Sequence, residues 1–254
     1  MRTVRIYSPE ALKPGTRTEL TGGPARHVNQ VLRMQPGAML TLFDGRGGEY
    51  PAQIVSSRRG RLVVDTGNHH PVERESALSV TMWPALCKRS RMDNIIQKAT
   101  ELGVAAIRPV HSERSQIKLD TARAARKLRH WQEVIISACE QCGRNRLPDI
   151  AGPTGLGDLL STVATFDHAV LLDPAGAEPL GDSLRPQDRV LMLTGPEGGF
   201  SAEERRAAAA HGVRSVRFGP RVLRTETAPV AALAVLQWLA GDMGSGTPGS
   251  NSVG

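Results

Sequence analysis

Apolar and polar positions near the start of the chain alternate in short runs separated by turn residues, which is the pattern of a small β-rich domain. Ala38 to Phe43 alternates in this way, the sequence DGRGG predicts a turn, and Tyr50 to Val55 is expected to return as the partner strand. Arg61 to Asp65 predicts one more strand. Residues 68–76 carry a proline and several charges, so we place the domain boundary there.

The pattern changes after this boundary, where short strands alternate with longer segments of 3.6-residue period. This alternation is typical of an α/β domain with a largely parallel sheet. The predicted strands are Leu78 to Pro84, Val104 to Val110, His168 to Leu172, Arg189 to Leu193 and Ser215 to Phe218. The third and fourth are short apolar runs, as expected of strands buried on both faces.

Helices are predicted over 92–102, from near 120 to 142, over 202–210 and from 227 to 240. Ser90 is expected to cap the first helix and Thr227 the last. Ser201 and Glu204 form a capping box in front of the third. Beyond Gly241 the chain has nothing to bury, so 242–254 is predicted to be a disordered tail.

Apolar runs and cysteines indicate the compartment. No apolar run of signal-peptide type is present at the start, and the run Pro229 to Ala240 is shorter than the roughly 20 residues that span a bilayer. We therefore expect a cytoplasmic protein without a membrane segment. Cys139 and Cys142 form a CxxC inside a helical pattern with no second ligand pair, so helix packing is favoured and no metal is predicted.

Composition favours an anionic partner. Of the 254 residues, 32 are Lys or Arg and 25 are Asp or Glu, which gives a net charge of +7 and points toward nucleic acid. The dinucleotide pattern GxGxxG follows none of the predicted strands, and the phosphate-binding pattern GxxxxGK[ST] is missing from the sequence. The chain therefore does not match the common nucleotide-binding classes.

Two glycine-bearing loops follow short buried strands, at the sheet edge where open α/β sheets bind ligands. The first loop is TGPEGGF at 194–200, and the second is FGPRVLRTETA at 218–228. We expect a side chain at Gly195 or Gly198 either to require a strained backbone or to project into a ligand. The alternative is that both segments are ordinary connecting loops.

Five sequence runs resemble motifs of one family. LTGPEGGFS, RVLRTETA, KRSRMDNIIQKATELGV, EQCGRNRLP and HVNQVLR are similar to the successive motifs of the RsmE family of SPOUT-superfamily methyltransferases. The resemblance implies S-adenosylmethionine-dependent methylation of N3 of a uridine in 16S ribosomal RNA of the small subunit. It also implies a PUA-like β-barrel RNA-binding domain over 1–72, a SPOUT α/β domain with a deep trefoil knot over 73–241, and a homodimer.

The cofactor pocket implied by this resemblance is formed by the two loops and a neighbouring strand end. Its apolar residues would hold adenine, while main-chain groups of the loops would form hydrogen bonds. The implied residues are Leu172, Leu193, Thr194, Gly195, Pro196, Glu197, Gly198, Gly199, Phe218, Gly219, Val222, Leu223 and Thr227.

Uridine N3 carries a proton that must leave before it can accept a methyl group. A base, or a cation that stabilises the developing charge, would assist this step. We predict Arg224 as the electrostatic stabiliser and Glu226 as the base or as an orienting group. The alternative is that Arg224 and Glu226 pair with each other and only hold the loop.

Clustered cations in the family motifs are predicted to contact RNA phosphates. These residues are Arg5, His27, Arg33, Lys88, Arg91, Lys98, Arg144 and Arg146, and the partner is 16S rRNA or the assembled small subunit. The run of basic residues at 123–129 is instead typical of a solvated helix face.

Two other functions remain open at this point. A methyltransferase of the same superfamily that acts on ribose 2′-OH would carry the same two loops. A non-catalytic ribosome-assembly factor would bind RNA through the β-rich domain and would not bind S-adenosylmethionine.

Overall fold

The computed structural model describes residues 3–58, 60–115, 117, 119–180 and 184–244. The chain forms two compact units. Unit 1 comprises Met1–Glu75 and Ile136–Leu147, and unit 2 comprises Ser76–Ile135 and Pro148–Gly254. The first crossing between units falls within the linker at 68–76, but the segment 136–147, which the sequence pattern assigned to the second domain, belongs to unit 1.

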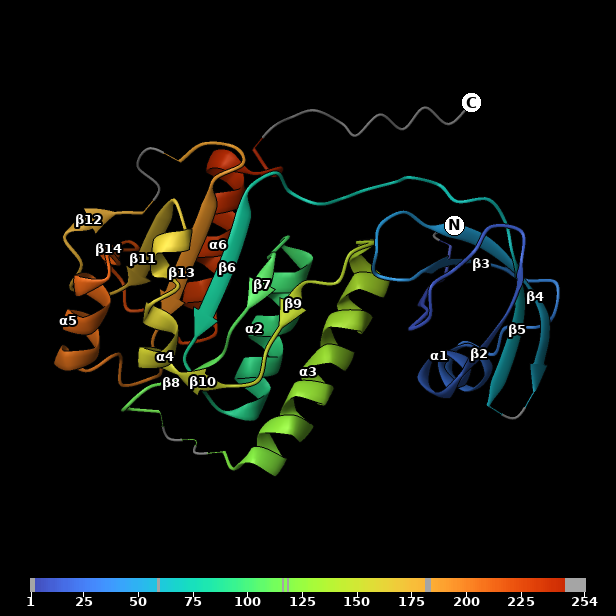
Figure 1. Ribbon diagram of the computed structural model, residues 1–254, viewed down its shortest axis with the longest axis horizontal. Helices are drawn as coiled ribbons and strands as arrows, with labels where there is room; N and C mark the ends of the chain where they lie inside the picture. Colours follow the sequence, from blue (N-terminus) through green and yellow to red (C-terminus); the bar gives the residue numbers. More distant parts are fainter. Residues whose placement is uncertain (1–2, 59, 116, 118, 181–183, 245–254) are drawn as a thin grey trace. The chain divides into compact units, whose positions relative to one another are not determined.

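Unit 1 is built on a five-stranded sheet of order β1-β3-β4-β5-β2 (Figure 1). Strand β1 runs parallel to β3, and the other pairs are antiparallel. The strands are β1 (Arg5–Tyr7), β2 (Arg17–Thr21), β3 (Met39–Phe43), β4 (Tyr50–Arg58) and β5 (Arg61–Thr66). The predicted hairpin of β3 and β4 is confirmed.

The core of unit 1 comes from alternate positions along these strands, such as Leu40, Leu42 and Ile54. Sequence reasoning missed β1 and β2, which are short and polar, and it missed two helical turns between β2 and β3. These turns are α1 (Gly22–Arg26) and the π-helical turn η1 (His27–Val31).

Unit 2 contains a seven-stranded sheet of order β12-β14-β11-β13-β6-β7-β9, in which all neighbouring strands are parallel. A separate pair is formed by β8 and β10. The strands are β6 (Ser79–Pro84), β7 (Ala106–Ile107), β8 (Val110–His111), β9 (Asp149–Ile150), β10 (Thr154–Gly155), β11 (His168–Leu172), β12 (Glu178–Pro179), β13 (Arg189–Thr194) and β14 (Arg214–Arg217). The strand expected over 104–110 is divided, because Pro109 has no N–H to continue a ladder.

Helices cover both faces of this sheet. Leu191 and Leu193 of β13 share an apolar cluster with Leu156 and Leu160, whereas the alternate residue Met192 points to the opposite face, on which α6 contacts β6 and β13. The helices are α2 (Arg89–Glu101), α3 (Thr121–Cys142), α4 (Leu156–Leu160), the 3-10 turn η2 (Val163–Thr165), α5 (Ala202–Ala210) and α6 (Thr227–Ala240).

Of the three predicted helix caps, one is confirmed and two are wrong. Ser201 and Glu204 form the capping box of α5. However, α2 begins one residue before Ser90, and Thr227 is the first residue of α6 rather than its cap. In both helices the capping residue makes no side-chain hydrogen bond to the first turn.

None of the helices in the described part of the chain is long and apolar enough to cross a membrane. Of the tail predicted to be disordered, residues 245–254 lie outside the described residues.

Candidate functional site

The two glycine-bearing loops meet in unit 2 around a cavity of about 530 Å³, at the carboxyl ends of β11 and β13. The loops that follow β13 and β14 form most of its wall. The lining residues that the sequence predicted for the cofactor or for catalysis are Leu172, Thr194, Gly195, Pro196, Glu197, Gly199, Phe218, Gly219, Val222, Leu223 and Arg224.

Three predicted cofactor residues do not line this cavity in the described chain: Leu193, which lies in the core, Gly198 and Thr227. Six lining residues were not predicted for this role, namely Arg91, Asp173, Pro174, Arg221, Thr225 and Ala228. The position of Asp173 and Pro174 directly after β11 was a usable signal, since ligands bind at strand ends.

The first loop turns tightly, and its glycines are not equivalent. The N–H of Gly199 donates to the carbonyl oxygen of Pro196 at 2.9 Å, and Gly199 has a left-handed φ of +65°. A Cβ atom at Gly195 would lie 3.2 Å from Cα of Gly199, whereas one at Gly198 would meet only the Arg114 side chain at 3.5 Å. The expectation of strain at Gly198 is therefore wrong, and the left-handed residue is Gly199.

The cavity has features that suit S-adenosylmethionine. The hydroxyl of Thr194 is buried and has no hydrogen-bond partner within the described structure, so it is available to a ligand. Leu172 and Leu223 add apolar wall for a purine ring. Val222 also lines the cavity, but it is 82% exposed and so is less enclosed than an adenine slot requires.

A guanidinium joins two carboxylates beside the cavity. Arg91 of α2 pairs with Glu197 of the first loop, and its Nε lies 3.5 Å from Oε2 of Glu226. The ion pair that sequence analysis weighed between Glu226 and Arg224 is not among those of the described residues. Arg224 instead lines the cavity with an exposed side chain.

The nearby thiol of Cys87 is not a nucleophile at neutral pH. Burial and the negative charge of Glu197 raise its pKa to about 12. It therefore remains protonated, and the carboxylates are the groups at this site that can accept a proton.

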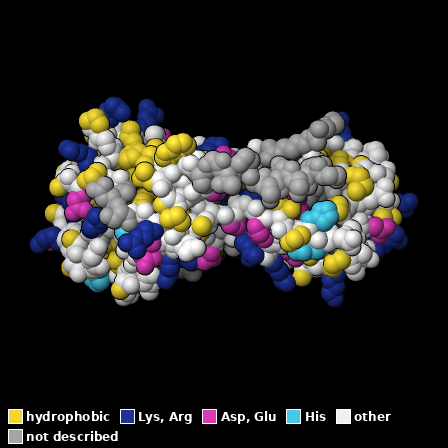
Figure 2. Space-filling view, turned by 90° about the horizontal axis from the view of Figure 1, so that it is seen from above, with side chains coloured by type: hydrophobic (Ala, Val, Ile, Leu, Met, Phe, Trp, Pro, Cys, Tyr) yellow, Lys and Arg dark blue, Asp and Glu magenta, His cyan; other side chains and the backbone are white. Residues whose placement is uncertain are grey.

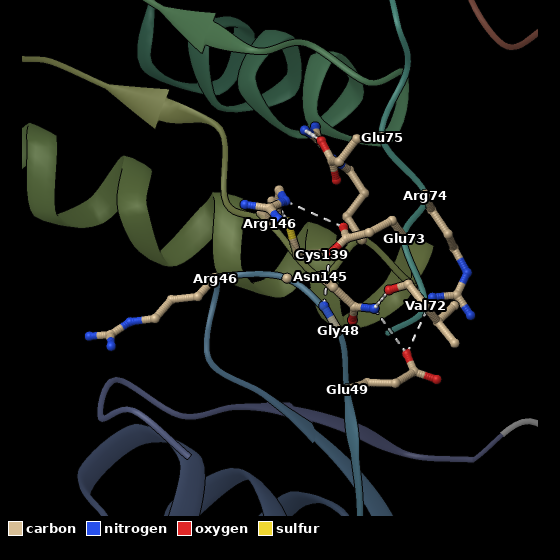
Figure 3. Close-up of polar contacts among 12 residues, drawn as sticks. Arg46, Gly48, Glu49, Val72, Glu73, Arg74, Glu75, Cys139, Asn145 and Arg146 are labelled. Atoms are coloured by element: carbon tan, nitrogen blue, oxygen red, sulfur yellow. Dashed lines mark hydrogen bonds and ion pairs between the residues drawn. The ribbon is translucent and has the colours of Figure 1, made fainter. Parts of the chain in front are cut away.

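In unit 1, two of the arginines predicted to contact RNA have buried side chains in a polar cluster. Figure 3 shows the part of this cluster around Glu49 and Asn145. The side chain of Arg5 is 8% exposed and pairs with Glu49, while Arg144 is 5% exposed and pairs with Glu75. Asn145 lies between them and accepts a hydrogen bond from Arg5. Phosphate contacts at Arg5 or Arg144 would require these pairs to open.

The charges of this cluster shift the pKa of its central carboxylate. Burial alone would raise the pKa of Glu49, but the hydrogen bond and charge of Arg5, together with Asn145 and Arg74, lower it below its ordinary value. Glu49 is thus held as an anion that fastens the segment after α3 to the β-sheet of unit 1.

The remaining residues predicted to contact RNA are more accessible. Arg146 is half exposed, with Nε 3.5 Å from a carboxylate oxygen of Glu73. Arg33 and Lys88 are exposed, and Lys98 pairs with Glu101 on the same helix. His27 lies with Nδ1 3.4 Å from Oε2 of Glu140, a carboxyl group whose pKa is raised by burial.

Cysteine and carboxylate groups in the described residues form no cluster that could hold a metal ion. Cys139 is buried in α3, and its pKa is raised by a hydrogen bond with Cys142 and by burial. This environment is that of a packed helix residue.

Comparisons with known proteins agree with both units. A model of an RNA methyltransferase domain matches residues 74–237, and a model of an RNA methyltransferase PUA domain matches residues 20–66. Ribosomal RNA small subunit methyltransferase E of Synechocystis is 33% identical over 92% of this chain and 77% of its own length. The protein of the same name from Bacillus subtilis is 31% identical over 86% of this chain and 89% of its own.

Solved structures extend the likeness to the whole fold. A putative methyltransferase from Legionella pneumophila, in complex with bound SAM, has a TM-score of 0.92 at 42% identity and covers 95% of this chain and 100% of its own. Ribosomal RNA small subunit methyltransferase E from Neisseria gonorrhoeae, bound to S-adenosyl methionine, has a TM-score of 0.90 at 38% identity. The match covers 95% of this chain and 99% of the Neisseria chain.

Fold and site together define an RNA methyltransferase, with a PUA-like half-barrel followed by a parallel α/β methyltransferase domain. Within this class, the chain belongs to the ribosomal RNA small subunit methyltransferase E family.

Proposed function

We propose that this chain transfers the methyl group of S-adenosylmethionine to N3 of a uridine in 16S rRNA of the small ribosomal subunit. The observation that carries the proposal is the cavity at the carboxyl ends of β11 and β13, with the buried, unpartnered hydroxyl of Thr194 in its wall. Two similar structures are described as bound to this cofactor.

The two loops would hold the cofactor between them. Main-chain groups around Gly195, the Thr194 hydroxyl and the apolar side chains of Leu172 and Leu223 would bind it. When bound, the cofactor supplies a methyl group on a sulfonium that is already activated for transfer. The protein's task is then to align the acceptor with that methyl group.

We assign the removal of the proton from uridine N3 to a residue of the second loop. Glu226 would accept the proton at its carboxylate, which stays near Arg91. Arg224, exposed at the cavity, would stabilise the charge that spreads onto O2 and O4 of the base. A 2′-OH acceptor would use the same cofactor loops and differ only in how it is held.

RNA binding is assigned to the exposed residues Arg33, Lys88 and Arg146, together with the half-buried Lys98 and His27. In a cytoplasmic enzyme the substrate is naked 16S rRNA or the assembled subunit. A trefoil knot of the SPOUT type is part of the same proposal.

A homodimer is proposed as the working form. Apolar side chains gather on one face of unit 2 in Figure 2. At the end of α6, Trp238 is 65% and Leu239 is 51% exposed, which is unusual for such large apolar groups outside an interface. Sedimentation of the wild type and of Trp238→Glu tests this assignment, because a dimer through this face should dissociate in the variant.

Nucleoside mass spectrometry of 16S rRNA from a strain lacking the gene tests the reaction. The proposal is supported if 3-methyluridine is lost from this strain and returns with the wild-type gene but not with the gene for Arg224→Ala. Loss of a 2′-O-methyl nucleoside would point to the other acceptor. Calorimetry that detects no S-adenosylmethionine binding to the purified protein would favour an assembly factor.

A further inference from the structure

Arg91 connects three segments that are far apart in the sequence. It lies in the first turn of α2, its Nη1 pairs with Glu197 after β13, and its Nε faces Glu226 before α6. Both carboxylates belong to the loops that form the cofactor cavity, and Arg91 itself lines that cavity. The sequence motif of α2 suggested a phosphate contact instead.

We infer that Arg91 is a positioning residue of the cofactor cavity, which holds the two loops together through Glu197 and Glu226. This inference rests on the proposed function for the identity of the cofactor. It assigns Arg91 no contact with the reacting atoms.

Electrostatics require a cation at this point. The side chains of Glu197 and Glu226 are 31% and 23% exposed, and like charges that converge on one place repel each other. Oε2 of Glu226 is buried and accepts no hydrogen bond in the described structure, so attraction by Arg91 is what offsets its burial. A planar guanidinium can face one carboxylate with Nη1 and another with Nε.

The same arrangement argues against a phosphate contact at Arg91. One positive charge between two carboxylates leaves a net negative charge, which does not attract phosphate. Removal of Arg91 should therefore affect the cofactor loops and should leave the salt dependence of RNA binding unchanged, since that dependence counts phosphate contacts.

The test compares Arg91→Ala, Arg91→Lys, Glu197→Gln and the double variant Arg91→Ala with Glu197→Gln, all in the full chain. Arg206→Ala is the matched control, because Arg206 is an exposed α5 arginine 3.8 Å from the carboxylate of Glu203 and lies away from the cavity. S-adenosylmethionine affinity is measured by calorimetry, methyl transfer by single turnover, and RNA affinity over a series of salt concentrations.

We expect Arg91→Ala to weaken cofactor binding and slow methyl transfer by about 10- to 100-fold in total, as misplaced positioning groups do. Arg91→Lys should recover only part of the loss, because it keeps the positive charge but not the two-sided guanidinium. The double variant should lose less than the product of the two single losses, since both remove the same link. The control should match the wild type.

Wild-type cofactor affinity in Arg91→Ala would overturn the inference, and so would fully multiplicative losses in the double variant. A reduced salt slope of RNA binding with unchanged cofactor affinity would return Arg91 to a phosphate contact. If wild-type protein binds S-adenosylmethionine but does not methylate uridine N3, the proposed function fails while calorimetry still decides the role of Arg91.

Discussion

Nδ2 of Asn145 donates a hydrogen bond to the carbonyl oxygen of Val72 at 2.6 Å. Asn145 is fully buried, and its Oδ1 accepts a hydrogen bond from the guanidinium of Arg5. This one side chain thus ties the segment after α3 both to the linker and to β1. In Figure 3 it lies at the centre of the polar cluster of unit 1.

Truncation of Asn145 should destabilise the protein. Asn145→Ala leaves the carbonyl of Val72 and the guanidinium of Arg5 each short of one partner, which we expect to cost about 1–3 kcal/mol of unfolding free energy. Urea unfolding measures the change. Asn68→Ala is the control, because Asn68 is exposed in the same unit and should unfold like the wild type.

Glu140 should make stability depend on pH. Its Oε1 accepts the N–H of Tyr7 at 3.0 Å, and burial raises its pKa although His27 and Arg5 act in the opposite direction. The folded state therefore binds this proton more tightly than the unfolded state does. The contribution of Glu140 to stability is highest below its ordinary pKa and falls as pH rises through the raised value.

The variant Glu140→Gln keeps an acceptor for Tyr7 and removes the charge. Its thermal unfolding temperature should exceed that of the wild type above the raised pKa, and the two should converge in acid. A wild-type advantage that grows with pH would show that the pair with His27 outweighs the cost of burial.

The first glycine-bearing loop should tolerate a methyl group at Gly198 but not at Gly195. Gly195→Ala brings Cβ within 3.3 Å of backbone atoms of Gly199 and Phe200, so the loop must shift and S-adenosylmethionine should bind more weakly. Gly198→Ala meets only the Arg114 side chain at 3.5 Å and should bind normally. Calorimetry on both variants checks this, and equal losses would contradict it.

Exposed and buried basic residues should behave differently toward RNA. Arg33→Ala and Lys88→Ala together should remove two phosphate contacts and so reduce the slope of log affinity against log salt by about 2. The melting temperature should not change. Arg144→Ala removes the ion pair with the carboxylate of Glu75, so its main effect should be a lower melting temperature. Binding isotherms over a salt series, paired with thermal scans, separate the two effects.

Local features were predictable from the sequence, and long-range partners were not. The capping box of Ser201 and Glu204 and the apolar strand β13 are short-range patterns, so they appear where the sequence placed them. Arg91 meets a glutamate 106 positions away, and Arg144 meets one 69 positions away. Sequence periodicity cannot show which carboxylate the fold brings to a given arginine.

The same reasoning explains the outcome at the candidate site. Glycine and proline define the two loops locally, and the parallel topology brings strand ends to one edge, so most of the cavity lining was predictable. How far Val222 is enclosed depends on the path of the loop, and this residue is 82% exposed.

Arg224 should contribute to the chemical step rather than to cofactor binding. Its exposed side chain lines the cavity, and Glu226 is paired with Arg91, so Arg224 is available to the acceptor base. Arg224→Ala should lower the single-turnover rate by about 10²- to 10³-fold, the typical loss for one charge-stabilising donor, with little change in S-adenosylmethionine affinity. Arg224→Lys should recover part of the rate, because a point charge does not reproduce the guanidinium fork. Rapid-quench measurements with saturating RNA test this, and a variant that loses RNA affinity at an unchanged rate would place Arg224 among the phosphate contacts instead.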